Sequence, residues 1–412
     1  MSDASSYSAT SPSSSESALA PRASLGALPL EIQRLIVHHA AANDGLLDNS
    51  RWSWNSRGSI WALYWTSTSW QDVCRETRWK SVSIRTKDED RAYAFNGDAA
   101  KSGRFIRRIS ITIDTNGAKV CDLLAASMMG MRSLEDVTIL PDRLAVADPD
   151  TEADPYSDLP LLTALGHLST LSALRVELLE GDSRTIRHLH SIIYTLQNLK
   201  LLELTIPGMA EFDNYEANDA CEGILDTVFS RPRLESLALV GAFGVNRIGW
   251  VACTAPLREL RITDPCDPND ETWGFSSLGE FLLKPDLYEN LLHLELIFYG
   301  SETLGTWSRY RADHNDWGYP GDRLQHLVLR SGSPCEAWNF RDSPLRSIDL
   351  ATPSEPILAE WPLVPLDDIY NAHNPPLLEK VTVRGRLAED SEGLVAWCKE
   401  RKVKLVLMPE ED

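Results

Sequence analysis

The stretch that decides the fold is Leu199–Leu204, which reads Leu-Lys-Leu-Leu-Glu-Leu and follows the pattern Leu-x-x-Leu-x-Leu. Leu202 and the last leucine of this stretch are two residues apart, so they point to the same face of a short β-strand. The first leucine fills the turn that leads into the strand. One such stretch carries little information by itself, and its weight comes from repetition along the chain.

The same pattern recurs through most of the chain, with first positions 21 to 37 residues apart. A final run from Val403 to Leu407 predicts a closing strand. In segment 80–100, Val82 and Ile84 predict a capping strand that is followed by a loop. Repetition at this spacing is typical of one structural unit stacked on itself. The first positions of the repeats are Ile106, Leu134, Leu171, Leu199, Leu234, Leu257, Leu291, Leu324, Leu345 and Leu378.

Apolar residues with helical spacing lie between several of the predicted strands. They occur in segments 120–128, 183–197, 217–229 and 394–398. Strand-then-helix units that bury each other's apolar faces form a βα solenoid. We therefore expect an α/β fold in which residues 86–412 form an irregular βα solenoid.

A second motif lies near the N-terminus, at Leu28–Ile36, which reads Leu-Pro-Leu-Glu-Ile-Gln-Arg-Leu-Ile. Pro29 and Glu31 favour the first turn of a helix, because this turn needs no N–H from proline and its positive dipole attracts an acid. A second helical segment, Trp61–Val73, contains Trp70. The apolar stripe of the first helix consists of Leu28, Ile32, Leu35 and Ile36.

Together these two segments resemble the F-box, the helical module that joins substrate receptors to the Skp-type adaptor of SCF-type cullin–RING ubiquitin ligases. The opening Leu-Pro-x-Glu-Ile is complete, but Ser69 replaces a frequent basic residue and segment 41–59 is a longer linker than usual. The resemblance covers about residues 25–80 and implies the adaptor, and through it a cullin, as partners. An ordinary amphipathic pair of helices is the alternative. The resemblance implies that six residues contact the adaptor or support that contact: Leu28, Pro29, Ile32, Leu35, Ile36 and Trp70.

The repeated unit resembles the leucine-rich repeat in its F-box-associated form, over about residues 100–408. This resemblance implies a horseshoe that binds a protein. The Asn or Cys expected eight residues after each first leucine is absent; Asp142 and Pro207 are two of the replacements. Because the asparagine ladder is missing, we expect an irregular, twisted horseshoe. A non-solenoid α/β sheet stays open as an alternative, since the repeat spacing is unequal.

The composition divides the 412-residue chain, which is 43% hydrophobic with a net charge of −20, into three expected parts. These are a disordered Ser-rich tail at 1–24, the F-box-like helical domain at 25–85 and the repeat domain at 86–412. No apolar run has membrane-spanning length and no basic stripe is present, so we expect neither membrane nor nucleic acid as a partner. Without a signal sequence, and with seven cysteines that show no metal spacing, the chain is expected in the cytoplasm, the nucleus or both.

Strand residues that point away from the helices are the candidates for substrate binding, because alternate residues share a face. We expect the middle of this face to be mainly acidic, which would attract a basic substrate segment, and its C-terminal part to be more basic. Loops at 264–275 and 305–322 are further candidates. The alternative is that these charged side chains only keep the exposed face of the sheet in contact with water and bind no partner. The predicted substrate-binding residues are Arg175, Glu203, Glu259, Arg261, Glu295 and Arg330.

No motif in the sequence points to catalysis, a metal or a cofactor, so we predict none of the three. A glycine-rich phosphate loop, a nucleophile elbow and zinc-spaced Cys or His residues are all missing. The acidic loop at 141–160 resembles a calcium loop only in part, because it lacks the required glycine and the final glutamate. His188 and His190 are two residues apart on a predicted helix, so they face different ways.

These patterns predict a non-catalytic substrate receptor, whose helices hold the ligase adaptor and whose repeats hold an unknown protein substrate. The first alternative is a repeat scaffold that has no ligase role and uses the helices as a cap. The second is an enzyme built on a divergent α/β sheet, which a deep pocket with converging titratable groups would favour.

Overall fold

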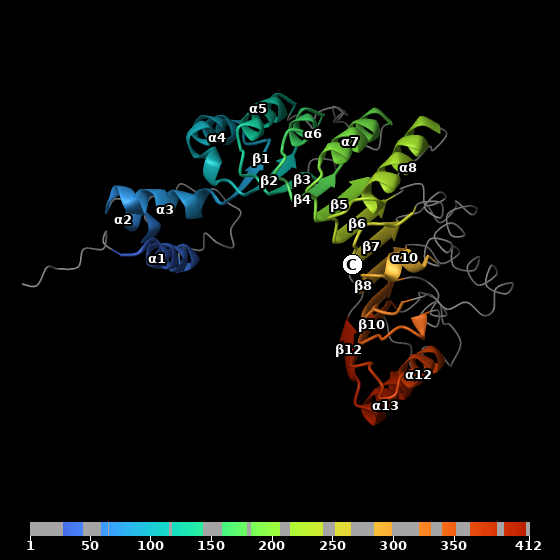
Figure 1. Ribbon diagram of the computed structural model, residues 1–412. Helices are drawn as coiled ribbons and strands as arrows, with labels where there is room; N and C mark the ends of the chain where they lie inside the picture. The colour runs from blue at the N-terminus through green and yellow to red at the C-terminus, as the bar shows by residue number, and fades with distance from the viewer. Residues whose placement is uncertain are drawn as a thin grey trace, which may run out of the picture. The chain divides into compact units, whose positions relative to one another are not determined.

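The computed structural model (Figure 1) describes residues 28–43, 59–64, 66–114, 118–142, 159–178, 183–206, 215–241, 252–264, 284–298, 321–330, 340–351, 363–384 and 391–408. These residues divide into two compact units along the chain, with the division between Arg78 and Trp79. We call them the helical unit and the sheet unit. The division precedes the boundary expected after residue 85, because the strand at 81–85 belongs to the sheet.

The helical unit contains α1 (Leu30–Asn43), α2 (Ser59–Tyr64) and α3 (Thr68–Trp79). Its small core joins α1 to α3 and consists of Val37, Ala40, Ala41, Trp70, Val73 and Cys74. Residues 44–58, which include most of the predicted linker, lie outside the described residues.

The sheet unit is an α/β structure with an open sheet of twelve parallel strands in the order of the sequence. Every predicted repeat contributes one strand, and the capping and closing strands lie at the two edges, as expected. This order is the one that a βα solenoid requires. The strands are β1 (Ser81–Arg85), β2 (Arg108–Ile113), β3 (Asp136–Pro141), β4 (Ala173–Glu177), β5 (Leu201–Ile206), β6 (Ser236–Gly241), β7 (Glu259–Asp264), β8 (His293–Phe298), β9 (His326–Arg330), β10 (Ser347–Ala351), β11 (Lys380–Arg384) and β12 (Lys404–Met408).

The helices of this unit lie along one side of the sheet (Figure 1). The helices predicted from apolar spacing in segments 120–128, 183–197, 217–229 and 394–398 are all confirmed. No helix in the described part of the chain is both long and apolar enough to cross a membrane. The helices are α4 (Glu89–Ser102), α5 (Ala118–Met129), α6 (Leu159–Leu165), α7 (Ser183–Thr195), α8 (Tyr215–Phe229), α10 (Pro285–Tyr288), α12 (Leu363–Asn371) and α13 (Ser391–Arg401), with a 3-10 turn, η2, at Gly103–Phe105.

The prediction of a loop up to residue 100 is wrong, because α4 begins at Glu89. Ala92, Phe95 and Ala99 bury one face of this helix against the core. Two of these three side chains are alanines, so the apolar stripe is weak in the sequence. Residues 143–158 of the acidic segment at 141–160 lie outside the described residues. They include the carboxylates that were compared with a calcium loop.

Backbone hydrogen bonds before each strand take the place of the absent asparagine ladder. The carbonyl oxygen of Arg107, for example, accepts the N–H groups of Glu135 and Asp136 from the next repeat, at 2.8 and 3.0 Å. These bonds fix the register without any special side chain. The same two-donor arrangement is made by the carbonyls of Lys80, Arg107, Glu135, Ser172, Lys200, Glu235, Arg258, Leu292, Gln325 and Arg346.

Candidate functional site

Helix α1 presents two different faces. One face is buried in the helical unit through Val37, Ala40 and Ala41. On another face, Ile32 is 41% exposed and Leu35 is 55% exposed. Exposed apolar side chains indicate a contact surface when they form one patch, and Ile32 and Leu35 are three residues apart, so they share a face of the helix.

The buried residues of the helical unit hold this exposed face in place. Gln33 is 3% exposed; its Nε2 donates to the carbonyl of Leu28 at 2.8 Å, and its Oε1 accepts from the Ser69 hydroxyl at 2.7 Å. Arg34 forms an ion pair with Glu76 of α3 at 3.1 Å. The start of α1 is therefore tied to α3 by polar contacts that the apolar period of the sequence does not reveal.

The predicted adaptor residues fall into three groups. Ile32, Leu35 and Pro29 are exposed, while Leu28 and Ile36 are half-buried and pack partly on the small core. Trp70 is completely buried, so of its two predicted roles only support of the helices fits the structure. Sequence reasoning missed Leu30, which is exposed in the first turn, and Gln33, whose helical spacing from Val37 was the available signal.

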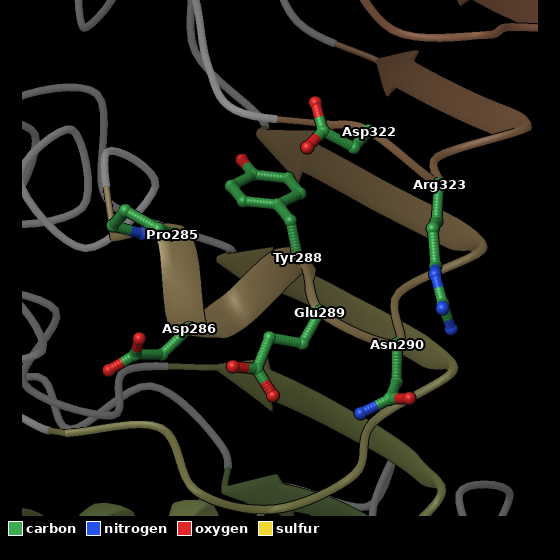
Figure 2. A pocket seen from close by; sticks show the side chains of 7 residues that line it. All are labelled: Pro285, Asp286, Tyr288, Glu289, Asn290, Asp322 and Arg323. Carbon is green, nitrogen blue, oxygen red and sulfur yellow. The ribbon is translucent and has the colours of Figure 1, made fainter.

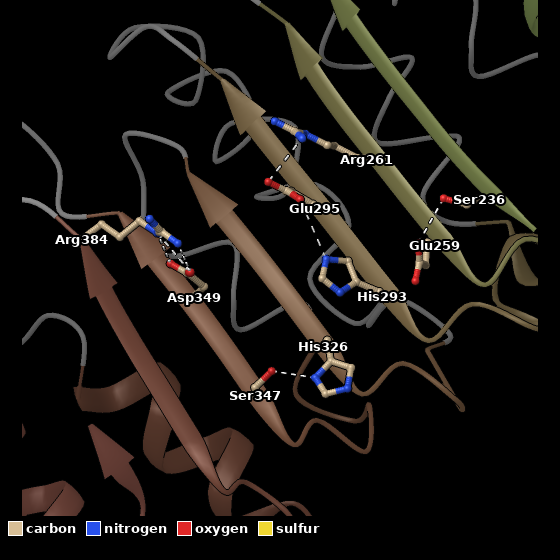
Figure 3. A network of polar contacts seen from close by, with 9 residues as sticks. All are labelled: Ser236, Glu259, Arg261, His293, Glu295, His326, Ser347, Asp349 and Arg384. Atoms are coloured by element: carbon tan, nitrogen blue, oxygen red, sulfur yellow. Dashed lines mark hydrogen bonds and ion pairs between the residues drawn. The ribbon is translucent and has the colours of Figure 1, made fainter. Parts of the chain in front are cut away.

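The second surface is the side of the sheet that faces away from the described helices, and we call it the open face. Figure 3 shows its polar side chains on β6 to β11. Side chains in register on neighbouring strands form rows across it. The middle row contains Arg175, Glu203, Arg261 and Glu295, so the structure brings four of the six predicted substrate residues onto one line.

The other two predicted residues lie on different rows. Glu259 is in register with Ser236 and His293 at the beginning of the strands, and Arg330 is in register with Ile297 near their ends. The row to which each residue belongs could have been predicted by aligning the repeats. Glu203 lies four residues after its first leucine, whereas Glu259 lies two residues after its own.

Two of the acids in the middle of the open face have arginine partners, and the expectation that this part of the face is mainly acidic stays a prediction. Arg175 lies 3.0 Å from Asp136 and 3.5 Å from Glu203. Arg261 lies 3.7 Å from Glu295. Arginine and glutamate are neighbours on β4 and β5 and again on β7 and β8, with Ala238 of β6 between the two pairs.

The first row of the open face has a different character (Figure 3). His293 and His326 lie in register with ring centroids 6.1 Å apart, and Nδ1 of His326 lies 2.7 Å from the Ser347 hydroxyl. Burial lowers the pKa of His326, and the nearby His293 and Arg346 lower it further. Next in register come Lys380 and Lys404, both exposed. The six predicted residues included neither lysine nor either histidine.

A pocket of about 470 Å³ lies at the turns that lead into β8 and β9 (Figure 2). Carboxylates of Asp286, Glu289 and Asp322 outnumber the single guanidinium of Arg323 in its lining. No histidine or cysteine is among the lining residues, so the pocket offers charge and hydrogen bonds. The remaining lining residues are Pro285, Tyr288 and Asn290.

The described cysteines are buried, which suppresses their reactivity. Burial raises the pKa of Cys74 to about 11, of Cys221 to about 12 and of Cys253 to about 11. Since the thiolate is the nucleophile, these thiols are poor nucleophiles near neutral pH. In the part of the chain that the structure describes, no three His, Cys, Asp or Glu side chains gather as metal ligands.

A comparison of the sequence with models of known protein families and with curated proteins gave no match.

Proposed function

We propose that this protein is an F-box substrate receptor, with a leucine-rich-repeat-like horseshoe, of an SCF-type ubiquitin ligase. The observation that carries the proposal is the exposed apolar face of α1, next to the Leu-Pro-x-Glu-Ile opening. In this proposal Ile32, Leu35 and Pro29 contact a Skp-type adaptor, Leu28 and Ile36 contribute their exposed edges, and Trp70 holds α3 against α1.

The position of the exposed side chains supports this proposal. Removing the apolar atoms of Ile32 and Leu35 from water on binding stabilises a complex by about 25 cal/mol per Å² of buried apolar surface. The same side chains contribute little to the fold while exposed. The exposed apolar face is therefore better explained by a partner than by the stability of the chain.

The sheet unit would hold the substrate in this proposal. Its stacked strands form a rigid scaffold, and the open face presents polar side chains in fixed rows. A receptor that holds substrate and adaptor together raises the effective concentration of one near the other, while other subunits carry out the transfer. The proposed partners are the adaptor, the cullin bound to it and an unidentified protein substrate in the cytoplasm or nucleus.

The proposal is tested by measuring the binding of the full chain to a purified Skp-type adaptor. We expect Ile32→Ala and Leu35→Ala to weaken binding by about 2 kcal/mol each, or about thirtyfold, if each is a hot spot. Urea unfolding should be unchanged, because both side chains are exposed in the free chain.

Val395→Ala on α13 is the matched control, because Val395 is also an exposed apolar helix residue. It should leave adaptor binding as in the wild type. No binding by the wild-type chain would reject the ligase role and favour the repeat scaffold. Normal binding by both α1 variants would show that the contact lies elsewhere.

A further inference from the structure

Lys380 of β11 and Lys404 of β12 form a like-charged pair on the open face. They are in register on neighbouring parallel strands, and both are exposed. Backbones of neighbouring strands lie about 4.8 Å apart, so the two ammonium groups repel each other unless an anion lies between them. Neither lysine has an ion pair or a hydrogen-bonded side-chain partner among the described residues.

Charged neighbours elsewhere on the open face have opposite signs. Arg175 lies between Asp136 and Glu203, and Arg261 pairs with Glu295. Two nitrogens of Arg384 hold the carboxylate of Asp349 at 3.0 to 3.1 Å, as Figure 3 shows. Among the described residues of the open face, the lysine pair therefore differs from these neighbours of opposite charge.

Protection of the sheet edge explains only half of the pair. Lysine on an edge strand discourages pairing with other chains, which accounts for Lys404 on the last strand. Lys380 lies one strand further in, where β11 is already paired on both sides. Like charges directly opposite each other destabilise a sheet, so fold stability does not account for Lys380.

We propose that the first row of β8 to β12 docks an extended segment of a partner protein that is rich in Asp and Glu. We call these residues the basic row: His293, His326, Ser347, Lys380 and Lys404. This proposal rests on the proposed function, because it names the chemistry of the segment that the open face would hold.

The dimensions of the basic row suit such a segment. Four strand spacings of about 4.8 Å give about 19 Å, the length of about six extended residues. The two lysines supply the charge at one end. The Ser347 hydroxyl and the imidazoles lie along the remainder, and such groups can donate hydrogen bonds to carboxylates. Nε2 of His293 already lies 3.9 Å from a carboxylate oxygen of Glu295.

The charge of the rest of the chain makes this row selective. The chain has a net charge of −20, which repels acidic polymers over most of its surface. Glu203 and Glu295 face arginines, and Glu259, which lies next to His293 in the first row, accepts a hydrogen bond from the Ser236 hydroxyl. The segment proposed for the first row is therefore acidic, whereas the sequence alone suggested a basic one for the middle of the face.

The test measures binding of the full chain to a fluorescein-labelled peptide by fluorescence anisotropy. The peptide has six consecutive Asp and Glu residues flanked by glycines. A peptide with Lys and Arg at the same positions is the comparison. We expect the acidic peptide to bind more tightly, and the Lys380→Glu/Lys404→Glu variant to weaken its binding at least about fivefold. The Lys380→Arg/Lys404→Arg variant should bind like the wild type.

Lys101→Glu/Lys119→Glu is the matched control, because it makes the same change in net charge at two exposed lysines on helices α4 and α5. It should bind the acidic peptide like the wild type. Equal weakening by both charge-reversed variants, or equal binding of the two peptides, would overturn the proposal. Adaptor binding is measured separately, so a chain that binds the adaptor but not the acidic peptide would refute only the partner chemistry.

Discussion

A buried arginine occupies a position where the two preceding repeats have leucine. Arg231 lies three residues before the first leucine of its repeat, as do Leu168 and Leu196, and it is 6% exposed. One terminal nitrogen donates to the carbonyl of Ile193 at the end of α7, and burial lowers the pKa of the guanidinium. The negative end of the α7 dipole compensates part of the cost of burying this charge.

This compensation predicts opposite outcomes for two substitutions of Arg231. Arg231→Ala leaves a cavity and should cost about 2 kcal/mol or more in the free energy of unfolding. Arg231→Leu copies the two preceding repeats and removes a buried charge, so its free energy of unfolding should stay within about 1 kcal/mol of the wild type or exceed it. Urea unfolding followed by circular dichroism measures both. A leucine variant as unstable as the alanine variant would show that the charge itself is required.

At the scale of elements, α7 and α8 pack closely because one position has no side chain. A Cβ atom at Gly223 of α8 would lie 2.7 Å from Cε1 of His190 on α7. The imidazole of His190 also lies 3.1 Å from the Thr227 hydroxyl. The glycine therefore makes room for the histidine, although it weakens its own helix by about 1 kcal/mol relative to alanine.

Two alanine substitutions test this close contact as a double-mutant cycle. Gly223→Ala alone should destabilise the chain or leave it unchanged, because the clash opposes the gain in helix propensity. In a His190→Ala background the same change should stabilise it by about 0.8 kcal/mol, since only the propensity gain remains. An equal effect of Gly223→Ala in both backgrounds would show that the two residues are not coupled.

His190 also links the packing of these helices to pH. Burial lowers its pKa, and Asp226 opposes this shift only in part. The unfolded chain then binds a proton more readily, so the stability that His190 contributes is present above pH 6.5 and is lost as the pH falls from there through the lower pKa of the folded state. The free energy of unfolding should change less between pH 7.5 and 5.5 in His190→Gln than in the wild type.

His167→Gln, at an exposed position after α6, is the control for general effects of removing an imidazole. It should keep the pH response of the wild type. The assignment fails if His190→Gln keeps that response too.

For the whole molecule, the sequence predicts the parts that depend on large apolar side chains. Every Leu-x-x-Leu-x-Leu run became a strand, because alternate leucines such as Leu202 and Leu204 are buried on the helix side. Helix α4 was missed because its buried face is mostly alanine. The hydrogen bonds that set the register were also hidden, since they join backbone groups that every residue carries.

In the candidate sites, too, the sequence predicted the features that depend on large apolar side chains and on their spacing. The exposed apolar face of α1 was visible as a period in the sequence, whereas Gln33 is polar and only its helical spacing from Val37 indicated that it is buried. On the open face the sequence indicated which residues point outward. The partners of Glu203 and Glu295, and the unmatched Lys380 and Lys404, became apparent only from the register of neighbouring strands.

The central claim is that the start of α1 is the surface that binds a Skp-type adaptor. The most direct measurement is hydrogen–deuterium exchange of the full chain with and without a purified adaptor. The account predicts slower exchange in Leu30–Asn43 when the adaptor is bound, and unchanged exchange in strands β4 to β8. Binding of the adaptor with unchanged exchange in α1, or slower exchange confined to the sheet unit, would contradict it.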